Sequence, residues 1–203
     1  MPTESASLSL LSVISLLSFF VALTVNKFSP KIGNGALMDQ DFDKPQAFHK
    51  EPAARSGGLA SIISLTIFFV LYYFLFQQIL TEYLVLSITL FLLGFSEDIK
   101  FKISPNYRLV LMIAILFVFI TFFSININSI DLIFLNIWMA NSIFANFFIL
   151  LCFLFIINGA NLIDGFNGLL TIHLLIINII LLFLNLNNNH EHLTIIITAQ
   201  IVV

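Results

Sequence analysis

Charged side chains are scarce in this sequence of 203 residues, where Asp, Glu, Lys and Arg together make up 9%. Soluble domains carry about 25% charged residues. The scarcity therefore excludes an ordinary soluble domain. With 60% hydrophobic residues and a mean hydropathy of +1.06, the composition is that of an integral membrane protein.

The sequence has a single cysteine and lacks the features of a cleaved signal peptide. Cys152 is the single cysteine, so no intrachain disulfide can form. Glu4 is the only charge before residue 27, and no small-residue cleavage site is evident, so a cleaved secretory signal is not expected. Neither a repeat nor a compositional break divides the chain, which predicts a single transmembrane domain over residues 1–203.

Long apolar runs occupy most of the chain, and a membrane-spanning helix needs about 20 such residues. A seventh run begins near Leu193 and reaches Val203, which is too short to span. Ser104 followed by Pro105 is a typical helix start. The sequence predicts an all-α, polytopic fold with six full transmembrane helices and a partial seventh. The six runs are at about 8–26, 58–76, 79–96, 106–123, 142–157 and 168–186.

No Lys or Arg occurs after Arg108 in the sequence. One bilayer crossing per run places three connections, 27–57, 97–105 and 158–167, on the same side. All eight Lys and Arg residues lie in or beside the first two of these connections. The positive-inside rule therefore assigns this side to the cytoplasm and the N-terminus to the outside.

The outer connections are expected to be less informative. Segment 124–141 is half apolar, and we expect it in the membrane interface with Trp138 at headgroup level. Segment 187–192 is interpreted as a solvated turn, with a metal site from His190 and His192 as the alternative.

Polar residues concentrate in segment 158–170, between two apolar runs. Glycine and asparagine favour turns over helices, and an ionisable residue beside a bilayer indicates function. Asp164 is either a site carboxylate or a turn former. Asn158 and Asn161 share a helix face and either bind phosphate or uracil oxygens or cap the helix end. Asn167 is favoured as the N-cap of the sixth helix.

Two adjacent carboxylates, Glu97 and Asp98, end the third apolar run. Acidic residues oppose the dipole at a helix C-terminus, so local stability does not explain them. Carboxylate oxygens are suitable ligands for a hard cation such as Mg²⁺. The alternative is an exposed acidic end in a loop that also contains Lys100 and Lys102.

The first connection holds His49, Lys50, Arg55, Gly57 and Gly58 within ten residues. Basic groups beside glycines suit phosphate binding through charge, a guanidinium fork and open backbone N–H groups. Plain positive-inside topology is the alternative, and it explains the charges but neither the glycines nor the histidine.

Two further residues have open roles. Arg108 lies in the first turn of the fourth helix, where it either snorkels to lipid phosphates or faces the site. His173 is interpreted as a packed, neutral histidine.

Taken together, the carboxylates, basic groups and glycines at one membrane face suit phosphoryl transfer onto or from a lipid.

Three ordered motifs resemble those of the polyprenyl-phosphate N-acetylhexosamine-1-phosphate transferase family, glycosyltransferase family 4. They are residues 49–58 (HKEPAARSGG), residues 94–98 (GFSED) with Arg108 downstream, and residues 158–168 (NGANLIDGFNG). The third is the specific one. The form of the first is closer to the branch that uses UDP-N-acetylhexosamines than to the muramoyl-pentapeptide branch.

This resemblance implies a Mg²⁺-dependent enzyme, with Mn²⁺ as the alternative cation. A polyprenyl (undecaprenyl) phosphate attacks the β-phosphorus of a UDP-N-acetylhexosamine, and UMP leaves. Glu97 and Asp98 match the family's acidic pair, which binds the metal or the lipid phosphate. Asn161 and Asp164 match its nucleotide-binding and catalytic turn.

The resemblance also places the protein in the bacterial inner membrane, with its active face cytoplasmic. The expected partners are the sugar nucleotide, the lipid phosphate and membrane lipid, and no nucleic acid is expected. The resemblance allows a homodimer. The product would be the first lipid intermediate of a cell-envelope polysaccharide.

Three features depart from the family pattern. The acidic pair is Glu-Asp where many members have Asp-Asp, and Asn167 replaces a frequent aspartate. The family's later loops, one with a Gly-Asp motif and one rich in His and Arg, have no counterpart, which leads us to expect a truncated product. The alternatives are a polytopic transporter, which would place polar groups near the bilayer midplane, and an inactive fragment.

Overall fold

In the computed structural model of the protein, nearly all of the described secondary structure is α-helix. The only strands among the described residues are two residues long, so the predicted all-α class is confirmed for this part of the chain. The described residues are 4–32, 37–39, 52–54, 56–98, 104–127, 130–163, 168–187 and 191–203.

The chain divides into two compact units, each described by itself. Unit 1 contains residues 1–101 and 166–203, and unit 2 contains residues 102–165. The helices of unit 1 are α1 (Glu4–Phe28), α2 (Gly57–Phe76), α3 (Thr81–Asp98), α7 (Leu169–Asn187) and α8 (Glu191–Val202).

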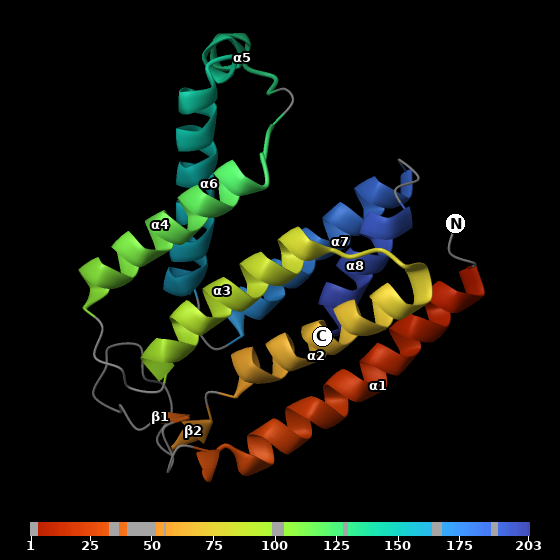
Figure 1. The fold of residues 1–203 in the computed structure, drawn as a ribbon. Coiled ribbons are helices and arrows are strands. Elements are labelled where there is room, and N and C mark those ends of the chain that lie inside the picture. The colour runs from red at the N-terminus through yellow and green to blue at the C-terminus, as the bar shows by residue number, and fades with distance from the viewer. Residues whose placement is uncertain are drawn as a thin grey trace. The chain divides into compact units, whose positions relative to one another are not determined.

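Unit 1 is built on α1 and α2, which lie side by side (Figure 1). The short strands β1 (Met38–Asp39) and β2 (Ala53–Ala54) pair antiparallel at one end of them, with Met38 opposite Ala54. Under this ribbon, the buried Ser29 hydroxyl donates to the Leu37 carbonyl at 3.4 Å. Backbone pairing therefore joins two described parts of the chain between α1 and α2.

The core of unit 1 joins three helices. Phe68 and Tyr72 of α2 are fully buried, as is Ala199 of α8, and Ile196 of α8 is almost fully buried. Ile14 of α1 completes the contact. Close van der Waals packing holds such helices together in a membrane, because lipid is as apolar as the side chains themselves.

Unit 2 contains α4 (Pro105–Phe122), α5 (Ile133–Met139) and α6 (Ser142–Ile163). Helix α6 contacts both α4 and α5. The predicted start of α4 is confirmed: Pro105 is its first residue, and the Ser104 side chain accepts a hydrogen bond from the Tyr107 backbone N–H at 3.5 Å.

Five helices of the described chain are long and apolar enough to cross a bilayer. Only helices with all their backbone groups bonded internally can do so, which explains why each apolar run is helical. Helix α3 is apolar over the shorter stretch Thr81–Ser96, and α8 over His192–Val202. The chain is a multi-pass membrane protein. The five segments with the length and composition of membrane spans are Ser7–Phe28, Gly57–Phe76, Pro105–Phe122, Ser142–Ile163 and Leu169–Asn187.

Three sequence expectations need correction. Helix α6 continues to Ile163, past the expected end at about residue 157, so Asn158 and Asn161 lie on the helix and not in the connection 158–167. His192 does not lie in a solvated turn but is half-buried in the first turn of α8, hydrogen-bonded to Tyr72. His173 is exposed on α7, a helix with no buried residue, so it is not a packed core histidine.

Candidate functional site

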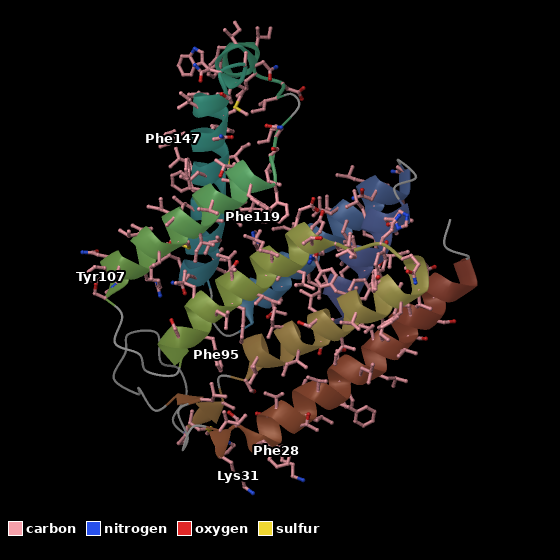
Figure 2. All side chains as sticks on the ribbon, in the orientation of Figure 1. Phe28, Lys31, Phe95, Tyr107, Phe119 and Phe147 are labelled. Atoms are coloured by element: carbon pink, nitrogen blue, oxygen red, sulfur yellow. The ribbon has the colours of Figure 1, made fainter. Side chains whose placement is uncertain are left out.

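The ends of three helices define one end of unit 1, which we call the motif end. Here α1 ends at Phe28, α2 begins at Gly57 and α3 ends at Asp98 (Figure 1). The three helices alternate in direction, and α2 contacts both of the others. Figure 2 shows Phe28 and Phe95 toward this same end. The first two sequence motifs therefore flank one end of the unit.

The direction of helix α8 shows at which end of unit 1 helix α7 begins, directly after the third motif. It starts beside Tyr72, far from Gly57, because the Tyr72 hydroxyl is hydrogen-bonded to Nδ1 of His192. Its other end reaches Gly58, since Gln200 and Val203 share a pocket with that glycine. Helix α7 packs against α8 and precedes it by a short connection, so α7 begins toward the motif end.

No described side chain caps the start of α2. Ser56 precedes the helix, but its hydroxyl donates to Oδ1 of Asn26 at 3.5 Å and makes no capping bond to the helix. Gly57 and Gly58 are exposed, and an added Cβ at either would meet nothing within 4 Å. Packing in the described structure therefore does not require glycine at these positions, whereas close approach of a ligand to the backbone would.

The acidic pair occupies the last two positions of α3. Just before it, the Ser96 hydroxyl donates to the Leu93 carbonyl at 2.7 Å, and the rings of Phe91 and Phe95 stack with centroids 5.0 Å apart. These contacts order the final turns of the helix. The described structure gives the backbone positions of Glu97 and Asp98 but not the placement of their carboxylates.

The third motif begins in unit 2, on the last turns of α6. The Asn158 side-chain amide donates to the Leu154 carbonyl at 2.8 Å, so part of its donor capacity is used within the helix. Asn161 is exposed one turn later. The motif resumes in unit 1 at Gly168, whose φ of +76° suits glycine and whose carbonyl accepts from the Ile172 N–H.

The remaining predicted site residues divide into two groups. Arg108 is half-buried in the first turn of α4, where its backbone N–H donates to the Ser104 carbonyl at 3.1 Å. Four others lie outside the described residues: His49, Arg55, Asp164 and Asn167. Gly168, not Asn167, is the residue directly before α7.

A pocket of about 320 Å³ lies beside the start of α2. Gly58 and Ser61 of α2, Phe91 of α3 and Gln200 of α8 line it. Sequence reasoning missed Ser61 and Gln200, because nothing local marks them: Ser61 lies in an apolar helix, and Gln200 lies in the short apolar run after Leu193. Among the described side chains, no group of three His, Cys, Asp or Glu residues comes together to hold a metal ion.

Comparison with known proteins supplies a family. A family model described as "Glycosyl transferase family 4" matches residues 80–203, which include the acidic pair and the whole third motif. No curated protein and no solved structure matches the chain.

Proposed function

The chain belongs to glycosyl transferase family 4, and we propose that it transfers an N-acetylhexosamine-1-phosphate from a UDP-sugar to a polyprenyl phosphate. The family supports a sugar-1-phosphate transferase that acts on a polyprenyl phosphate; the N-acetylhexosamine and the UDP leaving group are the proposal. The acceptor phosphate oxygen forms a bond to the β-phosphorus, the bond from that phosphorus to the bridging oxygen breaks, and UMP leaves with the electron pair.

The arrangement of unit 1 is the observation that carries this proposal. The start of α2 and the end of α3 share the motif end, and α7 begins toward it. Phosphoryl transfer depends on positioning and charge neutralisation more than on covalent chemistry. A site assembled from helix ends at a membrane surface can meet a soluble sugar nucleotide and a lipid headgroup at once.

Each motif has a role in this proposal. The backbone N–H groups of Gly57 and Gly58, with His49 and Arg55, bind phosphate oxygens. Asn158 and Asn161 donate to the nucleotide, and Arg108 faces the lipid phosphate.

The carboxylates fit a hard cation. Glu97 and Asp98 end the same helix, and together with Asp164 they supply the oxygen donors that Mg²⁺ prefers, with Mn²⁺ as the alternative. When bound, such an ion neutralises the charge of the diphosphate. No strong general base is needed, because a phosphate monoester with its second pKa near 6 is mostly ionised at neutral pH.

The experiment is a turnover assay in membranes that contain the protein expressed from its complete reading frame. With radiolabelled UDP-N-acetylglucosamine and undecaprenyl phosphate, we expect equal amounts of a lipid-extractable diphosphosugar and UMP, both abolished by EDTA. A sugar nucleotide that enters sealed vesicles unchanged, without lipid product, would instead favour a transporter. A parallel reaction with UDP-N-acetylgalactosamine would show which of the two hexosamines the protein transfers.

A further inference from the structure

Helix α5 and the first turns of α6 form an apolar corner on unit 2. Its pocket of about 540 Å³ is lined by Ile137, Trp138, Asn141, Ile143, Phe144 and Phe147. Four of the apolar side chains are largely exposed, at 56% for Trp138 and Phe147, 69% for Ile137 and 79% for Ile143. An apolar surface of this kind marks a contact with a partner or a membrane.

Aromatic contacts fix the orientation of Trp138 in this corner. Its ring makes edge-on contacts with Phe134 of α5, at a centroid distance of 6.1 Å, and with Phe144 of α6, at 5.5 Å. The contact with Phe144 therefore holds the indole against α6, in a corner whose other described lining residues are apolar except Asn141. Tryptophan of this kind is enriched where hydrocarbon meets headgroups.

Two asparagine side chains pair with backbone groups around the corner. The Asn136 side chain bonds to both the N–H and the carbonyl of Ile130, which closes the loop before α5. The Asn141 side-chain oxygen accepts from the N–H groups of Ile143 (2.9 Å) and Phe144 (3.3 Å) and so caps α6. Both arrangements remove unpaired backbone groups, as contact with a bilayer requires.

The apolar corner is continuous with the surface of a membrane-spanning helix, and this continuity indicates what covers the corner. Ile143 and Phe147 belong to α6, a bilayer-crossing helix, and their exposed side chains extend the surface of α5. Residues 132–163 contain no Lys, Arg, Asp or Glu, and Asp131 lies just before them. We propose that α5 lies on the bilayer with its apolar face in the outer acyl region, and that phospholipid fills the corner beside Trp138.

Trp138 is the single tryptophan of the 203 residues, so its fluorescence reports on this corner alone. The chain is reconstituted in phosphatidylcholine vesicles that carry a spin label either near the glycerol backbone or near the acyl-chain end. We expect stronger quenching by the shallow label than by the deep one, and weak quenching by aqueous acrylamide. A matched control, Trp138→Phe combined with Ile176→Trp in the middle of α7, should show the opposite order of the two labels.

Two outcomes would overturn the proposal. Strong acrylamide quenching without lipid quenching would place α5 in water. Quenching by neither reagent would place the corner against protein, including a second copy of this chain. As a further check, Ile137→Asp should increase acrylamide quenching of Trp138 without loss of the folded protein, because a charge on this face favours water over lipid.

Discussion

The Tyr72 hydroxyl and Nδ1 of His192 form a hydrogen bond between residues 120 positions apart in the sequence. Tyr72 is fully buried in the core that joins α1, α2 and α8, and the two rings meet edge-on. This bond fixes the start of α8 at the end of α2 remote from Gly57. It thereby sets the direction of α8 and, through the α7–α8 pair, the end of unit 1 at which α7 begins.

Removing this bond should loosen α8. Tyr72→Phe removes the hydroxyl that bonds to the half-buried His192 and should cost about 1 kcal/mol, which corresponds to a fall of about 2–4 °C in the Tm of a chain this size. The measurement is thermal unfolding in detergent. Tyr73→Phe is the matched control, because Tyr73 is the exposed neighbour on the same helix and should leave the Tm unchanged.

A double-mutant cycle distinguishes this bond from general packing. If Tyr72 and His192 interact directly, Tyr72→Phe with His192→Gln should destabilise the protein by less than the sum of the single changes. Additive effects would mean that the two side chains do not contact each other in solution.

Substitution of Gly58 should lower turnover without lowering thermal stability. Gly58→Ala adds a methyl group where the structure has nothing within 4 Å, and alanine in a helix is favoured by about 0.5–1 kcal/mol. We therefore expect equal or higher thermal stability together with reduced turnover, because the methyl group intrudes where phosphate approaches the backbone. Undiminished turnover would remove this glycine from the substrate site.

The carboxylates should matter for turnover but not for insertion. Asp98→Asn and Asp164→Asn should each lower the rate of lipid-product formation at least about 100-fold, equivalent to about 2.7 kcal/mol of transition-state stabilisation. Two matched controls carry the same change elsewhere: Glu82→Gln at the other end of α3, and Asp131→Asn before α5. Equal membrane levels of all four variants exclude failed insertion.

Loss of activity in the controls, or normal rates in both site variants, would contradict these roles. A rate reduced only at low Mg²⁺ and restored at high Mg²⁺ would identify the altered carboxylate as a metal ligand and not as a contact to the nucleotide.

Local signals in the sequence predicted local structure well. Ser104 and Pro105 specify the start of α4 through a capping oxygen and a fixed φ, both of which act within one turn. Hydropathy likewise located the long helices, because a bilayer admits little else.

Predictions that depended on tertiary context were less accurate. Asn158 and Gly159 favour turns in water, yet α6 continues past both, because a helix in a bilayer must keep its backbone hydrogen bonds. The partner of His192 could not be found from the sequence, since nothing near it indicates Tyr72. The roles of His49, Arg55, Asp164 and Asn167 stay predictions, because they lie outside the described residues.

The most direct test of the account is the sidedness of the second and third motifs. In a Cys152→Ala background, single cysteines replace Asp98 or Asp164, and vesicles of known orientation are treated with a membrane-impermeant maleimide. The account predicts that both positions react in inverted vesicles and that neither reacts in right-side-out vesicles. Labelling of the two positions from opposite sides would contradict a shared site at the cytoplasmic surface.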